Sequence, residues 1–165
     1  MDLLDRLLGH DAWTTRQLIK HCCKLSDEQL DRQFDIGHRS IRATLHHIIF
    51  NMEAWSALMS GVALPGPTSP DDDRSMSRFS SRLDLAVDRL AQIAKAIAVR
   101  GAWDERWLDV LDDPPAEKTY GGAIAHVITH SMHHRAQLLY MLRQLGVKNL
   151  PEGDVLSWEH QREPV

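Results

Sequence analysis

The chain has 165 residues, of which 43% are hydrophobic and 25% are charged, and its formal net charge at pH 7 is −4. This length is enough to bury a substantial core and fits one domain, so we expect residues 1–165 to fold together. The acidic balance and the lack of a dense lysine and arginine cluster argue against a nucleic-acid partner. The longest apolar runs fall far short of the ~20 residues of a membrane-spanning helix, so we expect no membrane partner.

The first 23 residues bear on localisation and on cysteine chemistry. The opening stretch MDLLDRLLGHDAW carries acids where a signal peptide would have an uninterrupted apolar stretch, so we expect a cytoplasmic protein. Adjacent cysteines rarely bridge each other, and Cys22 and Cys23 therefore give no disulfide framework. We interpret them as small helix residues, one of which faces inward; the alternative is a reactive thiol.

Helical periodicity dominates the chain, and no convincing strand pattern is present. Apolar residues recur at helical spacing in four long segments, which cover about 2–23, 40–60, 76–100 and, from a start between 119 and 122, up to 145. Ser26 is followed by acids, as a helix N-cap often is, which predicts a short extra helix after the first long one.

The segments between the long helices are irregular. Residues 61–74 contain three prolines and no periodicity, and we interpret them as a connection between helices. Residues 101–118 are also irregular, and the stretch RWLDVL within them is either a short strand or a turn. We expect both connections to shape the mouth of a pocket. The fold class that follows is all-α, a four-helix bundle with a short extra helix and irregular connections.

The last long helix carries four of the ten histidines within nine positions, at 126, 130, 133 and 134. On a helical projection, His134 falls inside the edge of the apolar arc, His130 lies just beyond it, and His126 and His133 point toward the flank. Side chains at i and i+4 are neighbours on a helix, so the imidazoles of His130 and His134 can converge on one cation. The alternative is a solvated polar face.

A third ligand is available from the second long helix, where TLHHIIF contains His46 and His47. These two side chains point about 100° apart on a helix, so at most one of them faces a given neighbour. Both lie off the main apolar stripe, and periodicity does not choose between them. One such histidine and the pair on the last helix could form a site inside a bundle.

Two charged residues occupy unexpected positions. Asp11 lies near the centre of the apolar stripe of the first helix, and Arg135 lies inside the apolar arc of the last. Buried charges are costly unless they are paired. We hypothesise that Asp11 is either an ion partner of Arg135 or an acceptor that orients a ligand histidine. The alternative is that helix ends or a dimer surface solvate both charges.

Three motifs, taken in order, resemble the DinB-like (also called YfiT-like) four-helix-bundle family. HDAWTTRQLI is similar to the family's first-helix pattern, SIRATLHHIIFNMEAW to its second-helix pattern, and HVITHSMHHRAQLLYMLRQLG to its last-helix pattern. The resemblance covers about residues 2–156. It implies a divalent metal ion, typically zinc or nickel, bound by His47, His130 and His134, and it implies a homodimer. Ala136 departs from the pattern, in which glycine is common after the arginine.

A site of three histidines keeps a coordination position open, unlike closed structural zinc sites, which use four protein ligands. Our main hypothesis is a hydrolase-type enzyme in which the metal activates water for attack on an unknown small molecule. The alternatives are a metal-dependent transferase of low-molecular-weight thiols, which the resemblance also allows, and a non-catalytic metal-binding stress-response protein. Glu53 could serve as a general base and His133 as a proton shuttle; the alternative for Glu53, which we favour, is a helix-surface or capping acid.

Overall fold

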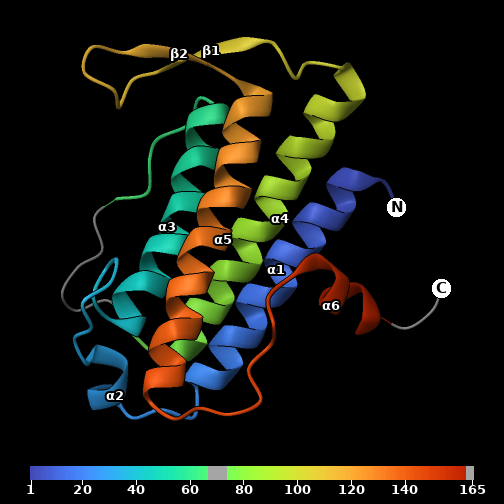
Figure 1. Ribbon diagram of the computed structural model, residues 1–165. Coiled ribbons are helices and arrows are strands. Elements are labelled where there is room, and N and C mark those ends of the chain that lie inside the picture. Colours follow the sequence, from blue (N-terminus) through green and yellow to red (C-terminus); the bar gives the residue numbers. More distant parts are fainter. Residues whose placement is uncertain (67–73, 163–165) are drawn as a thin grey trace.

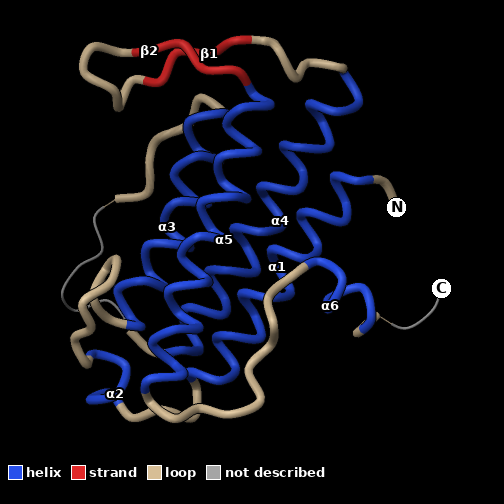
Figure 2. Tube along the Cα trace, in the orientation of Figure 1, coloured by secondary structure: helices blue, strands red, loops and turns tan. Residues whose placement is uncertain are grey.

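The computed structural model describes residues 1–66 and 74–162, and it is mainly helical (Figures 1 and 2). The elements in chain order are α1 (Leu3–Cys22), α2 (Asp27–Asp31), α3 (Ile41–Met59), α4 (Met76–Arg100), β1 (Arg106–Asp109), β2 (Ala116–Thr119), α5 (Tyr120–Gln144) and α6 (Val155–His160). The predicted all-α class is confirmed, with one small two-stranded sheet. None of the helices in the described part of the chain is long and apolar enough to cross a membrane.

Local sequence signals explain where the helices begin and end. The Ser26 hydroxyl accepts from the backbone N–H of Gln29, whose side chain returns a bond to the Ser26 N–H, so the predicted short helix starts with a capping box. Ser40 and Ser75 cap α3 and α4 in the same manner with their hydroxyls. Gly101 ends α4 with φ +66°, a left-handed conformation that glycine adopts without a steric penalty.

The four long helices form a bundle in which α1 and α3 lie diagonally opposite each other (Figure 1). Each of these two helices packs against both α4 and α5, so the order around the bundle is α1, α4, α3, α5. Figure 1 also shows that α3 and α4 run in the same direction, opposite to α1 and α5. The end of α3 and the start of α4 therefore lie at opposite ends of the bundle. The expectation that residues 61–74 shape a pocket mouth falls partly on 67–73, which lie outside the described residues.

The predicted apolar stripes meet in one core between the four helices. Its completely buried side chains come from every long helix: Leu18, Ile41, Leu45, Ile48, Ile49, Met52, Leu83, Leu90, Val127, Leu138, Met141 and Leu142. Some stripe residues pack at the edge and are only partly buried: Leu4, Trp55, Val87, Ile93 and Leu145. Cys22 faces this core, where burial raises the pKa of its thiol to about 12, whereas Cys23 is exposed. The prediction that one cysteine faces inward is confirmed.

A β-hairpin crosses the end of the bundle and connects α4 to α5 (Figure 2). Its strands are antiparallel, with Trp107 opposite Lys118, so the RWLDVL stretch forms a strand rather than only a turn. The Asp109 carboxylate is buried and accepts from Lys118 Nζ at 2.5 Å. Trp107 packs edge-on against Trp55 of α3, with ring centroids 5.9 Å apart, which fixes the hairpin on the bundle.

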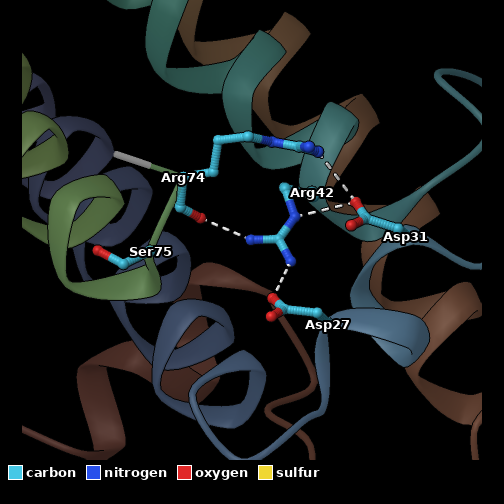
Figure 3. Close-up of a pocket in the computed structure, with 5 residues that line it drawn as sticks. All are labelled: Asp27, Asp31, Arg42, Arg74 and Ser75. Carbon is cyan, nitrogen blue, oxygen red and sulfur yellow. Dashed lines mark hydrogen bonds and ion pairs between the residues drawn. The ribbon is translucent and has the colours of Figure 1, made fainter. Parts of the chain in front are cut away.

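A pocket between α2, α3 and the start of α4 is lined by Asp27, Asp31, Arg42, Arg74 and Ser75 (Figure 3). Arg42 is buried and uses three of its nitrogens there: one donates to Asp27, one to Asp31 Oδ1 at 2.9 Å, and one to the Arg74 carbonyl at 2.5 Å. Each of the three guanidinium nitrogens thereby has a protein partner. We infer that this network of hydrogen bonds and ion pairs stabilises the packing of α2 and the start of α4 against α3.

The C-terminal segment folds back on α1 through α6, which the sequence did not predict. The Trp158 ring lies so close to α1 that a Cβ on Gly9 would be 2.7 Å from Trp158 Cζ2, so only glycine allows this approach. Beside it, the His10 ring is 3% exposed, and its Nε2 donates to the Gly153 carbonyl at 2.8 Å. His10 and Trp158 together fix the segment that precedes α6.

The buried His10 predicts a dependence of stability on pH. Burial lowers the pKa of His10 from its ordinary value near 6.5, and the bond to Gly153 opposes this shift only in part. Below about pH 6.5 the unfolded chain therefore binds a proton that the folded chain does not, and the free energy of unfolding falls as the pH falls. We expect metal-free His10→Gln to lose less stability than the wild type between pH 7 and pH 5, measured by urea unfolding. Parallel curves would contradict this account.

Candidate metal centre

Four imidazole rings come together between α3, α5 and the loop that precedes α3. His47 Nε2 lies 3.3 Å from His130 Nε2, which in turn lies 3.2 Å from His134 Nε2. The fourth ring belongs to His38, and one ligand nitrogen from each of His38, His47 and His134 lies within 4.8 Å of the others. All three histidines that the resemblance implied as ligands are therefore in one cluster, and His38 joins them.

The spacing of these nitrogens fits a shared cation. Two nitrogens bound to one tetrahedral zinc ion at ~2.0–2.1 Å lie about 3.3–3.4 Å apart, because the angle between them is about 109°. The two Nε2 separations that involve His130 agree with this value. The histidines on α3 and α5 are held by helices that pack directly against each other, so the cluster has a rigid frame.

Gln137, one turn further along α5, sets the orientation of His134. Its Oε1 lies 2.8 Å from His134 Nδ1, and its Nε2 lies 2.9 Å from His133 Nε2. When His134 Nδ1 carries the proton and donates it to this oxygen, the lone pair of the ring is left on Nε2, which faces the cluster. The Nδ1 atom of His130, in contrast, is buried without a hydrogen-bond partner among the described residues. The orientation of the His130 ring therefore depends on the contacts of its Nε2 atom with His47 and His134.

The environment favours the neutral form of these rings. Burial and the neighbouring imidazoles, of which His38 contributes most, together lower the pKa of His47 to about 4. Burial and the nearby His134 likewise bring the pKa of His130 to about 4. At neutral pH these rings are uncharged, and an uncharged imidazole nitrogen is the form that binds a metal ion.

The structure separates the two adjacent histidines of α3. His47 points into the cluster, whereas His46 stacks on Phe50 at a centroid distance of 5.9 Å and meets Phe79 of α4 edge-on. Glu53 also faces α4, where its carboxylate is held by both Arg82 Nε and Arg82 Nη2 at 3.1 and 2.7 Å. This ion pair gives Glu53 a structural role between α3 and α4, and no contact joins it to the cluster in the described residues.

A series of aromatic contacts connects the hairpin to the cluster. Trp55, which packs on Trp107 of the hairpin, lies 5.0 Å from the His126 ring, and His126 lies 5.1 Å from His130. His126 and His133 are both exposed beside the cluster, as the helical projection predicted for the flank of the arc. Trp55 and His126 border the site on the side that faces the hairpin.

The buried charges of α1 and α5 form an ion pair next to the cluster. Both Asp11 and Arg135 are 2% exposed, and Arg135 Nη1 donates to Asp11 Oδ1. Burial raises the pKa of the Asp11 carboxyl, and the Arg135 guanidinium opposes this rise. The hypothesis that Asp11 pairs with Arg135 is confirmed, and no described histidine hydrogen-bonds to its carboxylate. The pair fixes the rotation of α5 about its axis one residue after His134.

The hydrogen bond that Gln137 Oε1 accepts from His134 predicts that Gln137 contributes to metal affinity. A partner that orients a ligand histidine typically adds 10–100-fold in affinity. We therefore expect Gln137→Met, which keeps the length of the side chain, to weaken zinc binding by about tenfold or more. The measurement is a competition titration against a chromophoric chelator. Gln144→Met, an exposed change at the end of the same helix, serves as the control, and equal affinities in the two variants would contradict the assigned role.

Comparison with known proteins identifies the family. The model of the DinB family matches residues 1–163. The chain belongs to the DinB family. The resemblance deduced from the three helix motifs is therefore confirmed across nearly the whole chain. Protein DinB of Bacillus subtilis (strain 168) is 21% identical over 164 residues, an alignment that covers 91% of this chain and 90% of that relative.

Membership of the DinB family and the histidine cluster point in the same direction. The family match covers α3 and α5, which supply His47, His130 and His134, and it also covers the loop that carries His38. Together these findings support metal binding by the cluster. They assign neither the metal ion nor a reaction.

Proposed function

We propose that His47, His130 and His134 hold one divalent metal ion, zinc or nickel, and that the bound ion makes this DinB-family protein a hydrolase-type enzyme. The observation that carries the proposal is the convergence of three Nε2 atoms with separations of 3.2 and 3.3 Å. Imidazole ligands suit both zinc and nickel. A divalent ion held by three imidazoles acts as a Lewis acid and supplies hydroxide near neutral pH.

The position of the cluster supports a reactive site rather than a closed structural one. His134 is 7% exposed, but His47 and His130 are only partly buried, and His38 is exposed. A small molecule from solvent can therefore reach the ligands. Structural zinc sites, in contrast, use four protein ligands and leave no position for such a molecule.

Each residue around the ligands has a defined task in this proposal. Gln137 holds His134 in the tautomer that presents Nε2 to the ion. His133 is exposed beside the cluster and hydrogen-bonds to Gln137, so in this proposal it is placed to accept or return a proton. His126 and Trp55 form an adjacent wall that excludes water from one side of a bound substrate.

The experiment compares metal-free protein with protein loaded with zinc or nickel on a panel of chromogenic esters. We expect hydrolysis to need the metal, to be lost in His130→Ala and to persist in His46→Ala. Equal rates with and without metal would overturn the hydrolase proposal. If the loaded protein instead joins a low-molecular-weight thiol to an electrophile, the metal site stands and the reaction is a thiol transfer. Metal binding with neither activity would favour a non-catalytic stress-response role.

The resemblance also leads us to propose that the protein is a homodimer. The described exposed face of α5 carries apolar side chains, Met132 and Tyr140 among them, at 52% and 46% exposure. Such a face is compatible with a subunit contact but does not identify one. Light scattering of the eluting protein gives the mass directly, and twice the 18.8 kDa of one chain is the expected result.

A further inference from the structure

His38 is the member of the cluster that does not lie on a helix. It belongs to the loop between α2 and α3, and its ring centroid lies 3.8 Å from that of His47 and 5.0 Å from that of His134. A ligand nitrogen of His38 lies within 4.8 Å of ligand nitrogens on both of these residues. The ring is thus beside the proposed metal position while its residue is exposed to solvent.

The backbone of this loop is shaped to hold His38 in place. Gly37 and Arg39, on either side of it, both have left-handed conformations, with φ +48° and +68°. A non-glycine residue such as Arg39 adopts this conformation only where the surroundings enforce it. Those surroundings include three short-range bonds, from Phe34 N to Arg39 O at 2.7 Å, from Arg39 N to Ile36 O at 2.9 Å, and from Ser40 N to His38 O at 2.8 Å.

Gly37 also brings the loop onto the cluster. A Cβ at this position would lie 2.1 Å from Gln137 Oε1, the same oxygen that lies 2.8 Å from His134 Nδ1. Because glycine has no side chain, the loop can lie directly on the Gln137 amide that hydrogen-bonds to His134. The loop and the cluster therefore fit each other at two points, through Gly37 against Gln137 and through His38 against His47.

We propose that His38 is a fourth, exchangeable ligand, which binds the ion in the resting protein and gives way when an anionic small molecule arrives. This inference rests on the proposed function. The other ligands stand on packed helices, whereas His38 is exposed on a loop and can swing outward without disturbing the core. In the exchange, the bond between its ring nitrogen and the ion breaks and a bond to an anionic oxygen or sulfur forms, with no oxidation or reduction. The resting site is closed and the reacting site is open.

The test uses full-length protein loaded with zinc or cobalt(II). We expect His38→Ala to weaken zinc binding by about tenfold, less than His47→Ala does, because the three helix ligands remain. We also expect the visible spectrum of the cobalt protein to change, since water replaces a nitrogen ligand. Azide, as an anionic probe, should bind cobalt more tightly in His38→Ala because it no longer competes with the imidazole. His46→Ala, which removes a neighbouring histidine outside the cluster, should match the wild type in all three measurements.

A second variant separates the ring from the loop. Gly37→Ala retains His38 but pushes the loop away from Gln137, and we expect it to shift the cobalt spectrum and azide affinity in the same direction as His38→Ala. If His38→Ala has the zinc affinity, cobalt spectrum and azide affinity of the wild type while His47→Ala loses zinc, the role of His38 is overturned and the three-histidine site stands. If His47→Ala also retains zinc, the proposed function fails together with this inference.

Discussion

Replacing Asp11 by alanine is expected to destabilise the metal-free protein by about 3–5 kcal/mol, because the change leaves the Arg135 guanidinium buried without its counter-ion. Arg135 already has two nitrogens, Nε and Nη2, that lack hydrogen-bond partners among the described residues. Its charge therefore depends strongly on the carboxylate of Asp11. For a chain of this size the change corresponds to a fall of roughly 10 °C in the melting temperature. Urea unfolding at pH 7 with a chelator present measures the effect.

Two further variants compare the buried ion pair of Asp11 and Arg135 with an exposed ion pair. Asp84→Ala breaks the exposed ion pair between Arg16 and Asp84, and we expect it to cost less than about 1 kcal/mol. Asp11→Ala combined with Arg135→Met removes both buried charges, and it should recover much of the lost stability because an apolar side chain suits the site. A loss in Asp11→Ala no larger than that in Asp84→Ala would contradict the account of this pair.

Replacing His130 by alanine is expected to have opposite consequences with and without metal. In the metal-free protein the change removes a crowded ring whose buried Nδ1 has no partner in the described part of the chain, so stability should stay level or rise. In the presence of zinc at about 100 times its dissociation constant, the wild type should gain about 2.7 kcal/mol, and the variant should gain almost nothing. Thermal unfolding with chelator and with saturating zinc measures both effects.

The control for this prediction is His46→Ala, because His46 lies on α3 beside His47 but points toward α4. We expect this variant to keep the full stabilisation by zinc. A shift with zinc that is the same in His130→Ala and the wild type would show that His130 is not a ligand. A shift that disappears in His46→Ala as well would place the metal elsewhere on α3.

Much of the fold could be predicted from sequence because its signals are local. The apolar period along each long helix, the hydroxyls of Ser26 and Ser40, and Gly101 act within a few residues, and the structure has the helices where these signals place them. The hairpin and α6 were not predicted because they depend on distant partners. β1 packs on Trp55 of α3, and α6 needs the space that Gly9 of α1 leaves for the Trp158 ring.

In the candidate site, too, local spacing could be predicted from the sequence, whereas contacts between distant residues could not. The i, i+4 spacing brought His130 and His134 together in the prediction, and their Nε2 atoms lie 3.2 Å apart. Periodicity could not choose between His46 and His47, since the choice depends on which neighbouring helix, α4 or α5, each side chain faces. His38 was not predicted because it lies between the predicted helices, where no helical spacing connects it to the other histidines. Gly37, the residue before His38, was the available sequence signal. Its role is visible only in the structure, where it lies against the side chain of Gln137.

The measurement that tests the central claim most directly is the metal content of tag-free protein by elemental analysis, beside His47→Ala and His130→Ala. We predict about one zinc or nickel ion per chain in the wild type, in line with the one histidine cluster found among the described residues, and a loss of that ion in both variants. A wild type that binds no metal, even after zinc or nickel is added, would contradict the account. The cluster would then be a polar histidine face between α3 and α5.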